Sequence, residues 1–247
     1  MQIAADKCVG CKQCVVFCPV EAIKTSDMVP EAADGRGVWI DFDECVECYS
    51  CLRMANCPTQ AILESPETSS EPRIQRRAFS DPKCDHKSVG FPGRGTEEVK
   101  TNDVSGVVKR GQVAVGIEMG RPGHGTSLVD VDKVSRAMAS IGYPIPKHNA
   151  LYYLLENPET GEIKKQYLNE RFLSAIVEFS APEERIGFIF ETLEKISKEI
   201  DTVFSLCMFG RYDGKDLPMM GHIKKHKPPH TPHAKVNIGL GRPFSEG

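Results

Sequence analysis

The chain has 247 residues, of which 40% are hydrophobic and 26% are charged, with a formal net charge of -3. This balance is typical of a globular protein, and the net charge argues against a protein that binds nucleic acid. No stretch of about 18 apolar residues is present and the N-terminus leads into the first cysteine run without a signal peptide, so we expect no membrane span and a cytoplasmic protein.

Eight of the ten cysteines lie in two similar runs near the N-terminus. The runs are Cys8-x2-Cys11-x2-Cys14-x3-Cys18-Pro19 and Cys45-x2-Cys48-x2-Cys51-x5-Cys57-Pro58. Three thiolates spaced three residues apart, with a later cysteine followed by proline, form the ligand pattern of a 4Fe-4S cluster. The third cysteine of each run would be surplus in a tetrahedral zinc site, which two pairs complete. The similarity extends to the neighbouring residues, since 6–14 align with 43–51 and 18–26 with 57–65, so the sequence predicts two 4Fe-4S clusters.

Residues 1–65 therefore resemble a dicluster bacterial ferredoxin, a family of electron carriers. In that family the cysteine before proline ligates the cluster of the other run. The resemblance implies one cluster on Cys8, Cys11, Cys14 and Cys57, and a second on Cys18, Cys45, Cys48 and Cys51. The family usually has three residues between the third and fourth cysteines, whereas the second run has five, so we expect different amide hydrogen bonds or solvent access there. Such thiols also suit a reducing and anaerobic interior.

The charge is distributed unevenly along the chain. Residues 1–65 hold ten acidic and five basic residues, against 24 acidic and 26 basic residues in the remainder. An acidic redox module favours docking onto a basic surface, either of a partner or of this chain's second half. An ordinary solvated acidic surface is the alternative.

We expect a linker or surface strap over residues 66–105, and no folded element between Ser65 and Pro82, because that stretch is rich in Ser, Pro, Glu and Arg. Cys84 and His86 follow, and such a pair could be half of another metal site. An unligated cysteine beside a linker is the simpler interpretation.

Residues 106–220 show alternating strand and helix patterns. Strands are expected at 113–119, 150–155, 173–179 and 202–209, and helices at 130–141, with Asp130 as the cap, and from about residue 182 to residue 200. The order is βαββαβ, which predicts a ferredoxin-like sandwich and an α+β fold class for the whole chain. The topology is similar to that of small-molecule-sensing ACT-type domains. Cys207, in the last strand, is expected to be a buried apolar residue.

Glycine and arginine recur in three stretches, 91–96, 120–125 and 239–243. The middle stretch could wrap an anion or a cofactor at a helix entrance, but it lacks the spacing of a nucleotide-binding loop, and a flexible connection is the favoured interpretation. All three stretches could also converge on one anionic ligand or partner. Residues 221–247 form a basic His- and Pro-rich segment. Because Pro228, Pro229 and Pro232 oppose a helix, we expect an extended strap that contacts a partner or the acidic module, with a metal site as the alternative.

The second half is also faintly similar to the iron-sulfur portion of 6-hydroxynicotinate reductase-type enzymes. That similarity implies delivery of low-potential electrons to a flavin or metal site elsewhere in a complex.

Three function classes follow from these observations. The first is an electron-transfer subunit, in which the second half docks the clusters onto a larger cytoplasmic oxidoreductase, and the absence of a visible catalytic constellation favours it. The second is a self-contained iron-sulfur flavin reductase. The third is a regulator whose second domain senses a small-molecule metabolite while the clusters sense redox state.

Overall fold

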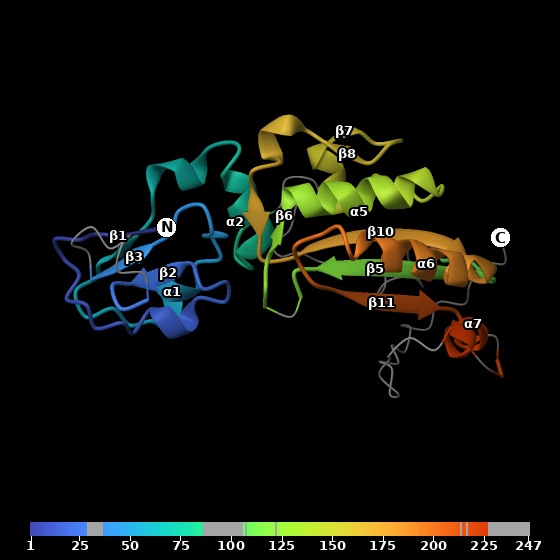
Figure 1. The fold of residues 1–247 in the computed structure, drawn as a ribbon, viewed down its shortest axis with the longest axis horizontal. Helices are drawn as coiled ribbons and strands as arrows, with labels where there is room; N and C mark the ends of the chain where they lie inside the picture. The colour runs from blue at the N-terminus through green and yellow to red at the C-terminus, as the bar shows by residue number, and fades with distance from the viewer. Residues whose placement is uncertain are drawn as a thin grey trace.

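The structure is a computed structural model that describes residues 1–28, 37–85, 106, 108–121, 123–212, 214–215 and 217–226. Figure 1 shows the N-terminal unit with its short strands at one end, the longer sheet at the other, and helix α2 between them. Among the described residues, no helix is both long and apolar enough to cross a membrane.

The N-terminal unit is built from short elements around the cysteine runs. Strand β1 (Gln2–Ile3) pairs with β4 (Ile62–Leu63), and β2 (Ile23–Thr25) pairs with β3 (Val38–Ile40), both antiparallel. The 3-10 turn η1 (Val15–Phe17) follows the third cysteine of the first run, and helix α1 (Ser50–Met54) includes the third cysteine of the second run. The two extra residues of the second run are thus accommodated by a longer helical segment.

The stretch expected to be an unfolded linker is folded between Ser65 and Ser80, so that prediction was wrong. It contains the 3-10 turn η3 (Pro66–Ser69) and helix α2 (Ile74–Ser80). Ala78 and Phe79 of α2 belong to the core of the second unit, and the Phe79 ring stacks on Phe172 with centroids 4.3 Å apart. The polar composition was misleading because Arg73 and Arg76 of this segment are buried in ion pairs, as described below.

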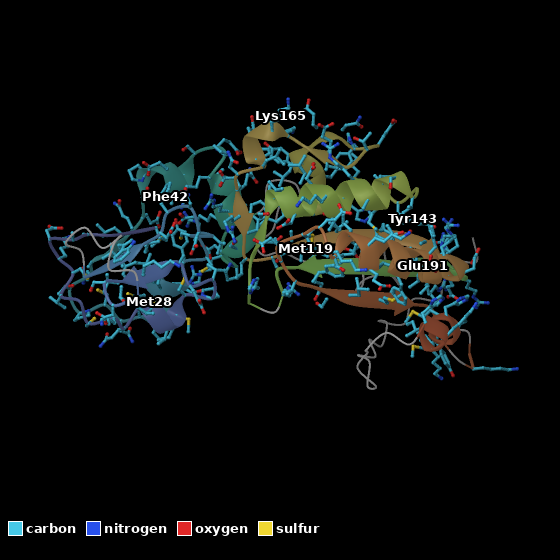
Figure 2. All side chains as sticks on the ribbon, in the orientation of Figure 1. Met28, Phe42, Met119, Tyr143, Lys165 and Glu191 are labelled. Atoms are coloured by element: carbon cyan, nitrogen blue, oxygen red, sulfur yellow. The ribbon has the colours of Figure 1, made fainter. Side chains whose placement is uncertain are left out.

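The second unit is centred on a three-stranded antiparallel sheet of β5 (Gln112–Met119), β10 (Ala175–Pro182) and β11 (Phe204–Gly210), in the order β10-β5-β11. Helices α5 (Leu128–Ser140) and α6 (Ile186–Ile196) contact each other and share one hydrophobic core with this sheet. The β5 side chains that enter the core alternate along the strand: Val113, Val115, Ile117 and Met119. Met119, labelled in Figure 2, lies at the end of β5 nearest the N-terminal unit.

Three strands and both helices of the predicted pattern are confirmed as elements, but the strand expected at 150–155 was wrong. Residues 150–154 form the 3-10 turn η4 (Ala150–Leu154), which buries Leu151 and Leu154. Asn149 fixes this turn, because its Oδ1 accepts from the Leu151 amide at 2.9 Å while its Nδ2 donates to the Ile176 carbonyl at 3.0 Å. The predicted cap of α5 was also wrong, since Ser127 caps the helix by accepting from the Asp130 amide.

Shorter elements complete the second unit. Strand β6 (Thr126–Ser127) pairs with β9 (Arg171–Phe172), and β7 (Leu155–Asn157) pairs with β8 (Glu162–Ile163). The 3-10 turns η5 (Lys165–Tyr167) and η6 (Glu183–Arg185) precede β9 and α6.

The last described element is helix α7 (Met219–His226), which includes the first part of the segment expected to be extended. That expectation was wrong for these residues, because Met219 and Ile223 lie one turn apart and are both buried in the core. The prolines come only after His226, and residues 227–247 lie outside the described part of the chain.

Candidate iron-sulfur site

The eight cysteines of the two runs surround two cavities in the N-terminal unit. One cavity is lined by Cys8, Cys11, Cys14 and Cys57, together with apolar side chains that include Ile3, Val9, Val38 and Ile62. The other is lined by Cys18, Cys45, Cys48 and Cys51, together with apolar side chains that include Val20, Ile23, Ile40 and Val46. Each cavity thus takes three cysteines from one run and a single cysteine from the other. We call them the first-run and second-run cavities after the run that supplies three.

Left-handed backbone recurs at equivalent positions of the two runs. Gly10 and Lys12, with φ of 69° and 62°, match Glu47 and Tyr49, with φ of 55° and 62°. Each pair brackets the second cysteine of its run, so the chain reverses its curvature on both sides of that residue. Glycine adopts this conformation freely, whereas the other residues require support from their surroundings.

A third equivalent pair places amide donors on the cysteines that precede proline. Glu21 and Gln60 have φ of 55° and 52°, and the residues after them, Ala22 and Ala61, donate their N–H groups to sulfur. The distances are 3.1 Å from Ala22 N to Cys18 Sγ and 3.3 Å from Ala61 N to Cys57 Sγ. Hydrogen bonds to sulfur stabilise a thiolate and adjust the potential of the cluster that it ligates.

The thiols differ in their ionisation. Burial raises the pKa of Cys14 and of Cys45 to about 11 and that of Cys51 to about 12. Burial also acts against ionisation of Cys57, but amide donors outweigh it, and the pKa of this thiol is lowered. Metal ligation deprotonates a thiol outright. The positive charge of bound iron would therefore stabilise the thiolates of Cys14, Cys45 and Cys51, whose ionisation burial opposes.

The two cavities differ in exposure. Cys11 is exposed and Cys8 is half-buried, whereas Cys45, Cys48 and Cys51 are all buried. The first-run cavity is therefore nearer to solvent, and the second-run cavity lies deeper. The donor set of both, four thiols with apolar walls, fits a 4Fe-4S cluster.

Buried ion pairs support the second run, and sequence reasoning did not find them. Glu47 is fully buried, and its carboxylate accepts from the Met1 amino group at 2.6 Å and from Arg73 at 2.6 Å. Arg53 donates to the Cys48 carbonyl at 2.5 Å and to Asp81 at 2.9 Å. No local pattern pairs residues 26 or 28 positions apart, so only the fold reveals them.

The remaining candidate residues lie elsewhere. Cys84 is half-buried against the core of the second unit, with a pKa raised by burial, and His86 lies outside the described residues. Cys207 is half-buried rather than buried as expected, and faces Gly116 across β5 and β11. Of the three Gly-Arg stretches, 91–96 and 239–243 lie outside the described residues, as does Pro122 within the middle one.

The described part of the middle Gly-Arg stretch contacts the N-terminal unit. A groove of about 290 Å³ lies there, and its lining residues come from both units. The N-terminal unit contributes Pro19, Val20, Glu21, Lys24, Glu44 and Val46, and the second unit contributes Gly123, His124, Gly125 and Arg171. Val20 and Val46 also line the second-run cavity, so the groove and that cavity share a wall.

Comparison with known proteins supports the interpretation of the cysteine runs. Three relatives align with part of the chain. An uncharacterized protein in the rpl9-rpl11 intergenic region of Porphyra purpurea is 33% identical over 75 residues, which is 30% of this chain and 92% of the relative. A ferredoxin of Pyrobaculum islandicum is 30% identical over 74 residues, and pyruvate synthase subunit PorD of Methanocaldococcus jannaschii is 36% identical over 62 residues.

The alignments with the last two relatives cover 30% and 25% of this chain, and 61% and 62% of the relatives. No solved structure matches the chain. The family model described as a 4Fe-4S dicluster domain matches residues 7–61. Residues 7–61 are therefore a 4Fe-4S dicluster segment of the ferredoxin type, which carries two 4Fe-4S clusters.

Proposed function

We propose that this chain is the electron-transfer subunit of a larger cytoplasmic oxidoreductase. Cys8, Cys11, Cys14 and Cys57 hold one cluster, and Cys18, Cys45, Cys48 and Cys51 hold the other. The observation that carries the assignment is that these same two sets of cysteines line the two cavities. When bound, each cluster accepts and releases one low-potential electron.

The chain's own residues orient and shield the clusters in this proposal. The amides of Ala22 and Ala61 donate to ligand sulfurs. Apolar side chains such as Val38 and Ile62 exclude water from the first-run cavity, and Ile23 and Ile40 from the second-run cavity. A low local dielectric strengthens every charge interaction within the site and contributes to the potential.

The second unit is proposed to dock this redox module onto its partner. The sheet order β10-β5-β11 and the two helices in the same core support a ferredoxin-like sandwich. Its second predicted strand, at residues 150–155, is absent from this sheet. We propose the divisions 1–65, 66–105 and 106–220 as functional segments, with α2 joining the first to the third and α7 extending the third to His226. A relative described as a pyruvate synthase subunit supports membership of a larger complex.

Ligand substitution tests the assignment directly. Cys11→Ala and Cys48→Ala should each lose about half of the iron, because each removes one of four ligands from a single cluster. Cys84→Ala and Cys207→Ala are the controls and should keep the iron of the unsubstituted chain. Loss of both clusters in every ligand variant would leave the division into two sets unsupported, and iron loss in Cys84→Ala would reveal a third site.

Purification under anaerobic conditions from source cells tests the subunit role. We expect a stable complex with an oxidoreductase whose turnover requires this chain. An isolated chain that never associates with such an enzyme would contradict it.

The groove between the units supports a second candidate, a reductase with its own small-molecule site. Its wall is shared with the second-run cavity, so a bound acceptor would lie next to that cluster. Flavin bands in the absorption spectrum of the purified chain, or turnover of a small acceptor by the chain alone, would favour this candidate. A broad absorption near about 400 nm without flavin bands is expected for the carrier.

A further inference from the structure

Arg76 of α2 joins the second unit to the loop that leads into the second cysteine run. Its side chain is only 4% exposed. Toward the N-terminal unit, Nη1 donates to three backbone carbonyls: Asp43 at 2.7 Å, Cys45 at 2.9 Å and Phe42 at 3.3 Å. Toward the second unit, Nε donates to Glu170 Oε2 at 2.5 Å and Nη2 to the Asn169 carbonyl at 3.1 Å. One guanidinium therefore connects the loop that leads into the second cysteine run to Asn169 and Glu170, the residues just before β9.

Arg73, one turn earlier, contacts the same loop. It donates to Glu47 through Nε at 2.9 Å and Nη2 at 2.6 Å, and to the Phe42 carbonyl at 2.8 Å. Its guanidinium also lies 3.3 Å from the centre of the Phe42 ring, and Figure 2 labels this residue. Together the two arginines contact the segment from Phe42 to Glu47, which contains the proposed ligand Cys45.

The first run has no such support in the described part of the chain. No arginine side chain there donates a hydrogen bond to residues 5–14, and the charged contact of that loop is the exposed pair of Lys12 and Asp27. The two cluster sites thus differ in electrostatics although their cysteines are arranged alike. Permanent buried charge is concentrated at the second-run cavity.

Charge of this kind changes a reduction potential. A thiolate-ligated cluster becomes more negative when it is reduced, so a nearby cation stabilises the reduced form and raises the potential. Arginine keeps its charge at any ordinary pH, and its planar fork allows it to hold several acceptors at once. Glu170 lies on the far side of the guanidinium and offsets part of this effect.

We propose that Arg76 is a positioning residue through which the second unit sets the potential of the cluster in the second-run cavity. This inference rests on the proposed ligand assignment. Arg76 fixes the loop geometry and raises that potential above the potential of the other cluster. An electron that enters at the more exposed first-run cavity would then transfer to the cluster in the second-run cavity, because that cluster has the higher potential.

Redox titration of the full chain, followed by electron paramagnetic resonance, tests the proposal. The unsubstituted chain should show two one-electron steps at different potentials. Arg76→Met should lower the higher step and leave the lower one in place, because it removes a cation from one site. Glu170→Gln should raise the same step, because it removes the offsetting anion. Arg76→Lys keeps the positive charge but loses the planar guanidinium that binds several acceptors at once. It should therefore shift the higher step less than Arg76→Met does.

Arg136→Met is the control, since Arg136 lies on α5 with a side chain 45% exposed and pairs with Asp132. It should leave both steps unchanged. If Arg76→Met does not retain its iron, Glu170→Gln alone decides the question. Unchanged steps, equal movement of both steps, or shifts of the same sign in Arg76→Met and Glu170→Gln would overturn the proposal. A chain that holds two clusters but shows those results refutes only this inference, whereas a chain without two clusters refutes the proposed function itself.

Discussion

Glu47 combines three unusual properties in one residue. It is completely buried, it has a left-handed backbone, and it forms ion pairs with Arg73 and the amino group of Met1. The equivalent residue of the first run is Gly10, which adopts the same backbone without support. The ion pairs at Glu47 therefore hold a conformation that glycine provides in the other run.

Glu47→Gln should destabilise the protein by about 3–5 kcal/mol, because it leaves the buried Arg73 charge without its partner. Anaerobic urea unfolding would show this as a lower midpoint. Glu44→Gln is the matched control, because Glu44 is 44% exposed and pairs with Lys24 at 2.8 Å. Exposed pairs contribute about 0–1 kcal/mol, so a Glu47→Gln midpoint equal to that of Glu44→Gln would contradict the role given to the buried network.

Gly120 is a second residue whose identity the backbone requires. It has φ of +78°, and a Cβ at this position would lie 2.7 Å from the Gly125 carbonyl carbon and 3.0 Å from the Leu173 carbonyl oxygen. Gly123, in the same loop, has φ of +54° and nothing within 4 Å of its Cβ position. The two glycines share a left-handed backbone but differ in the space available for a Cβ.

Gly120→Ala should therefore lower the thermal midpoint more than Gly123→Ala does. The control carries only the left-handed backbone penalty, of order 1–3 kcal/mol, whereas Gly120→Ala adds a clash with main-chain atoms that cannot move away. Differential scanning of the anaerobic proteins measures both. Equal midpoints would show that the loop around Gly120 rearranges freely.

At the scale of elements, α2 is where the sequence was most misleading. Its Arg-rich and Ser-rich surroundings indicated a linker, yet Phe79 is 3% exposed and stacks on Phe172. The polar residues that suggested solvent exposure, Arg73 and Arg76, are themselves buried by partners distant in sequence. Residue type alone does not show whether an arginine has such a partner.

Phe79→Ala should destabilise the second unit by about 3–5 kcal/mol, the usual cost of removing a buried phenylalanine ring. Phe188→Ala is a suitable control because Phe188 lies on α6 with 41% exposure. Thermal unfolding followed by circular dichroism gives the comparison. A small effect of Phe79→Ala, similar to that of Phe188→Ala, would mean that α2 contributes little to the fold.

Elements with long hydrophobic patterns were predicted correctly from the sequence, and elements with short patterns were not. The alternation in β5 and the helical spacing of Ile186, Ile189 and Leu193 in α6 predicted both elements correctly. Residues 150–154 were too few for a periodic pattern to distinguish a strand from a 3-10 turn. The burial of both Leu151 and Leu154 fits the turn, because residues three apart share a face in a 3-10 helix and lie on opposite faces of a strand. The side chain of Asn149 decides between them through its bond to Ile176, a contact that no local pattern reveals.

At the scale of the whole molecule, the cysteine spacing predicted the dicluster family without help from the rest of the chain. Ligand spacing is informative because cluster geometry imposes it directly. The relation between the two units was not predictable, because it depends on pairs such as Arg76 with Glu170, which are 94 residues apart. The fold thereby brings the second unit against the second-run cavity rather than the first.

The presence of two iron-sulfur clusters can be measured by metal analysis of the anaerobically purified chain, combined with electron paramagnetic resonance after full reduction. We expect about eight iron atoms and about eight inorganic sulfides per chain, with the signal of two reduced 4Fe-4S clusters. Zinc in place of iron, or no paramagnetic signal in the fully reduced protein, would contradict it.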